Sequence, residues 1–216
     1  MEVDIVKKKV KNMTLRIKPD GAVVLTAPLR FADDKIQAFL AAKQDWIQKH
    51  VDKILQRKQE VVIPQGHLML HGEIYRVQND PDLKRDFVID YREHIIRSGK
   101  DLLDPKQQTI WYKAYAREVF EERLNALAHE YNLSYKQLII RDGKTRWGSC
   151  SSQKHISLSR RLIKMPDAVM DYVICHELAH LVHMNHSAAF WVQVEVFCPD
   201  YKQSIKWMKQ YGFSVY

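Results

Sequence analysis

The first hundred residues alternate between the two-residue period of strands and the longer period of helices. Residues 3–27 alternate apolar and polar positions around Pro19-Asp20-Gly21, which suits a tight reversal, and so predict a β-hairpin. Apolar residues then recur at three- and four-residue steps over 33–58, which predicts one helix. Strand character returns over Leu68–Val77, which folds back on itself, and over Phe87–Arg97.

The second half is predicted to be mainly helical, with a small sheet. An apolar stripe predicts a long amphipathic helix over Pro105–Tyr131. The other predicted elements are strands at Gln137–Ile140 and Ile156–Ser159, a loop through Gly148 between them, a helix starting at Pro166-Asp167, and helices over 188–198 and 200–210. We find no internal repeat. These elements indicate an α+β protein with a β-rich region at 1–104, including a long helix, and a second domain at 105–216.

Composition is that of an ordinary globular protein. The chain has 216 residues, of which 46% are hydrophobic and 28% charged, so it can bury a core. No run of 18 apolar residues and no secretory signal occurs, and three cysteines are too few for a disulfide framework. We therefore expect a soluble cytoplasmic protein with no membrane partner.

The helix that begins at Pro166 carries the H-E-x-x-H pattern of zinc hydrolases, from His176 to His180. The two histidines lie about 40° apart around the helix and one turn along it, so both imidazoles can converge on one Zn²⁺. Glu177 points about 100° away from His176, where its carboxylate can reach a water on the metal. This position suits a general base, so Glu177 is the candidate catalytic residue.

A third protein ligand is needed for zinc, and three residues close by are candidates. His183 lies roughly 10 Å along the helix from His176, too far for one ion to serve both easily, so we interpret it as a rim or supporting residue. His186 is the first choice, because Asn185 can end the helix in a left-handed turn and Ser187 can cap the next one. Glu195 is the second choice, or it orients a ligand imidazole.

Several motifs together give the chain a resemblance to a known family. In the second half they are Arg146-Trp147-Gly148-Ser149-Cys150-Ser151, Ile156-Ser157-Leu158-Ser159, Pro166, Tyr172-Val173-Ile174-Cys175-His176-Glu177-Leu178-Ala179-His180-Leu181, Asn185-His186-Ser187 and Phe190-Trp191. In the first half they are Pro19-Asp20-Gly21, Thr26-Ala27-Pro28 and Lys43-Gln44-Asp45-Trp46-Ile47. With these motifs the chain resembles the YgjP-like family of zinc metallopeptidases over nearly its whole length.

The resemblance implies a compact, gluzincin-like catalytic domain with a helix, a small sheet and a central metal helix. It also implies a zinc site made by His176, His180 and His186. The strand 156–159 would border the active-site cleft, which makes Ser159 a candidate substrate-binding residue. Family members often have asparagine at that position.

Basic residues are concentrated just before the metal helix. The chain carries a net charge of +8, and residues 136–164 hold eight basic residues against Asp142 alone. This favours an anionic partner, or it marks a solvated surface. Lys144 and Arg146 are candidate clamps for phosphates, and Trp147 stacks a base or packs in the core. Tyr172, one turn before His176, is a candidate oxyanion donor.

The sequence therefore predicts a zinc-dependent hydrolase, in the first place a metallopeptidase acting on a peptide or protein, with an anionic substrate if the basic segment faces the cleft. Another divalent metal could replace zinc. One alternative keeps the metal and hydrolyses a nucleotide phosphoanhydride, as a pyrophosphatase does. A second alternative is a non-catalytic, metal-stabilised module that binds nucleic acid through the basic segment. A cysteine nucleophile at Cys150, in the basic loop, also remains open.

Overall fold

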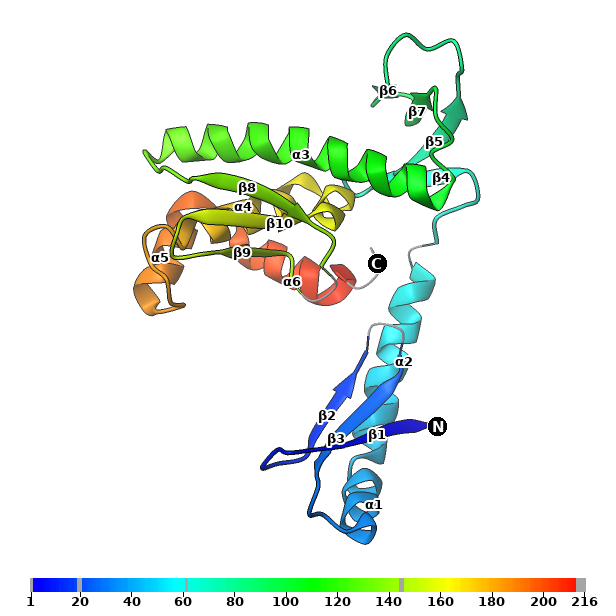
Figure 1. Cartoon of the computed structure of the whole chain (residues 1–216), viewed down its shortest axis with the longest axis vertical. Coiled ribbons are helices and arrows are strands. Elements are labelled where there is room, and N and C mark those ends of the chain that lie inside the picture. Colours follow the sequence, from blue (N-terminus) through cyan, green and yellow to red (C-terminus); the bar gives the residue numbers. More distant parts are fainter. Residues whose placement is uncertain (1, 19–20, 61, 144–145, 213–216) are drawn as a thin grey trace. The chain divides into compact units, whose positions relative to one another are not determined.

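The computed structural model describes residues 2–18, 21–60, 62–143 and 146–212, and the backbone alone for 56–60 (Figure 1). It divides into two compact units, Met1–Val62 and Ile63–Tyr216. The boundary predicted between residues 104 and 105 falls inside the second unit, because contacts join the segments before and after it. No described helix is long and apolar enough to cross a membrane.

The first unit is a three-stranded sheet with two helices. Its strands are β1 (Val3–Lys8), β2 (Thr14–Ile17) and β3 (Val23–Pro28), in the order β1-β3-β2. β2 and β3 form the predicted antiparallel hairpin, whose turn residues Pro19 and Asp20 lie outside the described residues. β1 instead pairs parallel to β3, so residues 3–27 form more than the hairpin that was predicted.

The helix predicted over 33–58 is two helices, α1 (Asp33–Ala42) and α2 (Gln44–Glu60). They are separated at Lys43, whose backbone N–H bonds to the carbonyl of Leu40 in a tighter turn. The buried Ile36 of α1 packs with Leu25 of β3 in the core of this unit.

A four-stranded sheet opens the second unit. Its strands are β4 (His67–Leu70), β5 (Glu73–Asn79), β6 (Phe87–Asp90) and β7 (Ile95–Ser98), in the order β4-β5-β7-β6. His71 and Gly72 make the tight turn between β4 and β5, with φ angles of 52° and 83°. Their backbone N–H groups bond to the carbonyls of Ile163 and Lys164. A Cβ on Gly72 would lie 2.9 Å from the ring of Pro166, so this turn packs directly against the start of the metal helix.

The rest of the second unit surrounds the helix that carries His176 and His180. α3 (Pro105–Glu130) begins at Asp104, whose side chain accepts hydrogen bonds from the first turn, as a capping residue does. A sheet of three strands follows, β8 (Gln137–Arg141), β9 (Gly148–Cys150) and β10 (His155–Ser159), in the order β8-β10-β9. Figure 1 shows α3 running alongside β8. The other elements after α3 are the 3-10 helix η1 (Arg160–Lys164), α4 (Asp167–Ala179), α5 (Ala188–Phe197) and α6 (Tyr201–Tyr211).

Two features of this sheet differ from the prediction. The predicted loop at Gly148 is the edge strand β9, which pairs antiparallel with β10. A second feature that the sequence did not predict is the order of the strands: β10 is the central strand and pairs on its other side with β8. α4 is buried along most of its length, as a central helix should be, and the whole is the α+β protein that was predicted.

Candidate metal centre

Three imidazoles meet at the end of α4. The helix ends at Ala179, and His180 caps it with helical angles, so His176 and His180 keep the one-turn spacing. One ring nitrogen from each of His176, His180 and His186 lies within 4.8 Å of the others. The Nε2 atoms of His176 and His186 are 3.1 Å apart. Two nitrogens on a tetrahedral zinc stand about 3.3 Å apart, so the imidazoles fit one such ion.

The segment after α4 brings His186 back to the other two histidines. α5 starts directly after it, with Ser187 as the expected cap accepting a hydrogen bond from the backbone of Phe190. The φ angle of Asn185 is not positive, so the prediction of a left-handed turn at this residue is wrong. The helix ends earlier, and the chain reverses through turns after His180.

Phe190 on α5 contacts all three imidazoles. Its ring centroid lies 4.9 Å from that of His176, 4.6 Å from that of His180 and 4.8 Å from that of His186, and its side chain is fully buried. Trp191 stacks on His186 at 6.0 Å. These rings pack against the imidazoles and restrict their rotation.

The second nitrogen of His180 also has a partner. Its Nδ1 lies 3.0 Å from the backbone carbonyl oxygen of His183, and a carbonyl can only accept, so Nδ1 carries the proton. The lone pair of His180 is then on Nε2, free for a metal. Such a hydrogen bond is the usual support of a metal-binding histidine. His183 thus contacts the site through its backbone carbonyl.

Burial tunes the ionisable groups of this site. Burial, with the neighbouring His180 and His186, lowers the pKa of His176 to about 4, so this imidazole is neutral at pH 7. Burial raises the pKa of Glu177 to about 8. Glu177 is 4% exposed, and its Oε2 has no hydrogen-bond partner among the described residues. A buried carboxylate without a partner is costly, and a cation beside it would remove that cost.

Gly148 of β9 lies directly against Glu177. A Cβ on Gly148 would stand 2.5 Å from Oε1 of Glu177 and 2.7 Å from its Cγ, closer than side-chain atoms approach one another. Only glycine therefore leaves room for the carboxylate in its present position. The edge strand β9 and the metal helix α4 thus fix Glu177 between them.

Comparison with known proteins decides the family. The profile described as YgjP-like, metallopeptidase domain, matches residues 11–211. The chain belongs to the YgjP-like family. A search of curated proteins gives no match.

Two solved structures are similar to part of this YgjP-like chain. One is the metallopeptidase zymogen of Pyrococcus abyssi abylysin, with 24% identity and a TM-score of 0.36 over 42% of this chain and 93% of its own. The other is the metallopeptidase zymogen of Methanocaldococcus jannaschii jannalysin, with 20% identity and a TM-score of 0.35 over 40% of this chain and 93% of its own.

The candidate substrate-binding residues fall in two neighbouring cavities of the YgjP-like chain. Arg146, Trp147 and Tyr172 line a cavity of about 700 Å³ together with His176 and Glu177. Ser159 lines a smaller one of about 290 Å³, where its hydroxyl caps η1 by accepting from the backbone of Arg161. Lys144 lies outside the described residues.

Other candidates are engaged elsewhere. Glu195 pairs with Lys202 at 3.2 Å and is not part of the histidine cluster. Burial, and the charge of Glu177, raise the pKa of Cys150 to about 11, which argues against a thiolate nucleophile.

Much of the basic segment is used within the protein. Arg160 and Arg161 contact Asp142 at 3.1 and 3.6 Å, and Arg141 donates to the hydroxyl of Ser157 at 3.1 Å. Lys164 lies over the ring of Tyr112, 4.9 Å from its centroid. These contacts leave less positive charge for an anionic partner than the sequence predicted.

Three parts of the site were not assigned a role from the sequence. They are the close approach of Gly148 to Glu177, the ring of Phe190 under the imidazoles, and the carbonyl of His183. Gly148 and Phe190 stand in the motifs of the YgjP-like resemblance, so they could have been singled out as neighbours of the site. Nothing in a sequence marks a backbone carbonyl.

Proposed function

We propose that this protein is a zinc-dependent peptidase in which His176, His180 and His186 hold the metal and Glu177 is the general base. The observation that carries the proposal is the convergence of three imidazole nitrogens within 4.8 Å beside a buried carboxylate without a partner. Membership of the YgjP-like metallopeptidase family supports it. Another divalent metal would use the same residues.

The chain's own residues then have defined tasks. A zinc ion supplies, when bound, a water of lowered pKa and a positive charge that polarises a carbonyl. Glu177 takes the proton of the attacking water on Oε2 and passes it to the leaving amine nitrogen. Burial raises the pKa of Tyr172 to about 12, so its hydroxyl stays protonated and can donate to the developing oxyanion.

The substrate is proposed to lie along β9. This strand is at the edge of its sheet, so its outer backbone groups can pair with an extended peptide. Because Gly148 adjoins Glu177, a peptide on that edge would pass beside the general base. The cavity of about 700 Å³ next to His176 has apolar walls, among them Trp147, Trp191 and Met208, and would take a large apolar side chain of the substrate.

The two alternative functions have less support. A pyrophosphatase needs several cations around the phosphates. Arg160 and Arg161 face Asp142, and the cavity at the candidate metal centre has two cationic side chains in its described wall, Arg146 and Lys209. A nucleic-acid-binding module would need the same charges on its surface. The nucleic-acid-binding module gives Glu177 no task, whereas a pyrophosphatase would use it as the base for the attacking water, so the substrate has to separate the two hydrolases.

Glu177→Gln tests the proposal, because it keeps the size of the side chain and removes its basicity. We expect the variant to bind zinc as the wild type does and to lose peptide hydrolysis by about 10²- to 10⁴-fold in kcat. The assay is cleavage of fluorogenic peptides with large apolar residues, with nucleoside triphosphates tested in parallel. Full peptidase activity in Glu177→Gln, or hydrolysis of nucleotides alone by the wild type, would refute it.

A further inference from the structure

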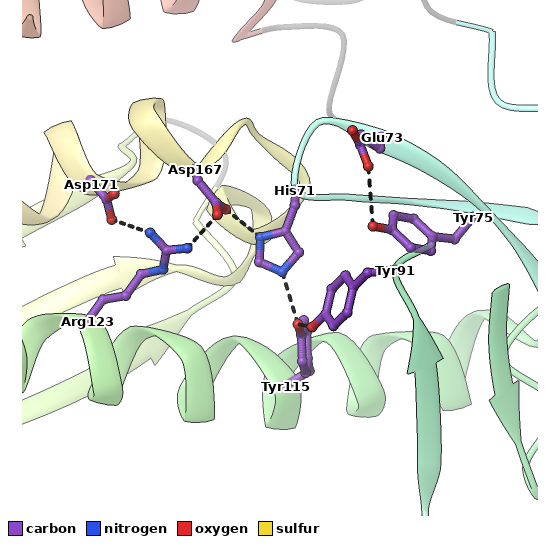
Figure 2. A network of polar contacts seen from close by, with 8 residues as sticks. All are labelled: His71, Glu73, Tyr75, Tyr91, Tyr115, Arg123, Asp167 and Asp171. Atoms are coloured by element: carbon purple, nitrogen blue, oxygen red, sulfur yellow. Dashed lines mark hydrogen bonds and ion pairs between the residues drawn. The ribbon is translucent and has the colours of Figure 1, made fainter. Parts of the chain in front are cut away.

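A second cavity, of about 610 Å³, lies in the second unit away from the metal centre. It is built between the β4–β7 sheet, α3 and the first turn of α4 (Figure 2). Asp167, which lines it, stands nine residues before His176 and therefore about half a turn around the helix from it. The cavity thus opens on another face of α4 and is a separate site. We call it the tyrosine pocket, after Tyr75, Tyr91 and Tyr115 in its walls.

The positive charge in the tyrosine pocket is already neutralised. Arg123 donates to Asp167 and to Asp171, each at 2.6 Å, so its guanidinium has two carboxylate partners. Two further carboxylates line the same cavity. Glu122 is exposed and has no partner among the described residues, and Glu73 contacts only Tyr75 and His94, at 3.4 and 3.6 Å. A local negative charge therefore remains in a protein whose net charge is +8.

A chain of hydrogen bonds runs along the wall of the pocket from Asp167 to Tyr91. His71 joins Asp167 through Nδ1 at 2.6 Å and Tyr115 through Nε2 at 2.9 Å, and Tyr115 joins Tyr91 at 2.8 Å (Figure 2). Burial opposes ionisation of Asp167, but bonds from His71 and Arg123 outweigh it and lower the pKa of this carboxyl. The carboxylate can only accept, so Nδ1 of His71 carries a proton, and in the neutral imidazole Nε2 is then the acceptor.

This polarity fixes the role of each hydroxyl. Burial raises the pKa of Tyr115, so its hydroxyl keeps its single proton, which goes to Nε2 of His71. Tyr91 must then donate to the oxygen of Tyr115. The oxygen of Tyr91 keeps its lone pairs, and this side chain is 56% exposed. The opening of the pocket therefore presents acceptors: the phenol oxygen of Tyr91 and the carboxylates of Glu73 and Glu122.

Acceptors, negative charge and aromatic walls together select a donor-rich organic cation. A bare metal ion fits less well, because the histidine triad is the only cluster of metal-binding side chains within the described residues. We propose that the tyrosine pocket binds an alkylammonium group, carried either by a lysine side chain or by a free polyamine. The ammonium would lie between the two glutamates, with its alkyl chain against the tyrosine rings.

Calorimetric titration of the full-length protein tests the proposal. The probes are spermidine, a blocked lysine (N-acetyl-lysine methylamide), and n-butanol as an uncharged probe. We expect saturable binding of spermidine or of the blocked lysine, and none of n-butanol. The cation that binds more tightly identifies the source of the ammonium group. The absence of saturable binding for both cations, or equal binding of n-butanol, would overturn the proposal.

Variants locate the binding in the pocket. Glu122→Gln should weaken it about two- to fivefold, and combination with Glu73→Gln should weaken it further, because each removes one exposed charge. Glu121→Gln is the matched control, since it makes the same change on the preceding residue of α3, which does not line the cavity. Glu122 is exposed, so its variant should fold. If Glu122→Gln leaves the affinity for the cation unchanged, or if Glu121→Gln weakens it by the same factor, the assignment to this pocket is contradicted.

Discussion

A single methyl group on β9 should displace Glu177, the proposed general base. In Gly148→Ala the added Cβ would stand 2.5 Å from Oε1, 2.7 Å from Cγ and 2.8 Å from Cδ of Glu177. Carbon and oxygen atoms in contact prefer about 3.5 Å, so the carboxylate or the strand must move by about 1 Å. Glu177 is 4% exposed, which leaves its side chain little space on the other sides. We expect the carboxylate to leave the position from which it serves the reacting water.

A shift of that size has a predictable effect on the rate. Misplacing a catalytic group by about 1 Å costs about 10²-fold. The expected loss in kcat/KM for Gly148→Ala is therefore about 100-fold, or about 2.7 kcal/mol in the activation free energy. The three imidazoles lie on α4 and next to α5, so zinc binding should change little. A large loss in kcat/KM with unchanged zinc binding therefore indicates that Glu177 has moved, and not that the metal site is lost.

The assay is peptide cleavage with zinc content measured on the same sample. Gly99→Ala is the matched control, because its Cβ would meet only the carbonyl oxygen of Asp80, at an ordinary 3.6 Å. It should keep the wild-type rate and zinc content. If Gly148→Ala cleaves peptides as fast as the wild type, the position of Glu177 does not limit catalysis and the reasoning fails.

Three further predictions concern the metal and the core. Phe190→Leu keeps an apolar residue against the imidazoles but lets them rotate more freely. The affinity for zinc, measured in competition with a chelator, should therefore fall about tenfold. An unchanged affinity would contradict the role of the ring. Removal of metal with 1,10-phenanthroline should abolish peptide cleavage, and one equivalent of zinc should restore it. Burial beside Arg160 and Arg161 lowers the pKa of Lys164 to about 8, below the unfolded value of about 10.4. The folded state thus disfavours the charged lysine, and the free energy of unfolding should rise between pH 8 and 10.4 in urea titrations, a rise that Lys164→Met should lack.

Local sequence patterns predicted those helices and strands in which apolar residues recur at a regular spacing or a capping residue stands at one end. The helix expected over Pro105–Tyr131 is observed over Pro105–Glu130. Asp104 caps its start, and an apolar stripe continues along its length, so both signals are local. The spacing of His176 and His180 predicted their convergence, because one helix carries both. These features depend on residues that are close in sequence.

Contacts between distant residues could not be predicted in this way. β9 has only three residues, Gly148–Cys150, none of which favours a strand, and it exists because β10 pairs with it. β1 joins β3 in parallel, a pairing that no local signal encodes. No local pattern marks His71 as part of a pocket, because its bond to Asp167 spans 96 positions.

The metal content of the purified protein tests the central proposal most directly. Elemental analysis of full-length protein, expressed without added metal and purified without chelators, should find one zinc or other divalent ion per chain. Glu177→Gln should keep the ion, because Glu177 is not one of the proposed metal ligands. His186→Ala should lose most of the ion, because it removes one of the three ligands. A wild-type protein without a divalent ion, or His186→Ala with a full equivalent, would contradict the three-histidine site.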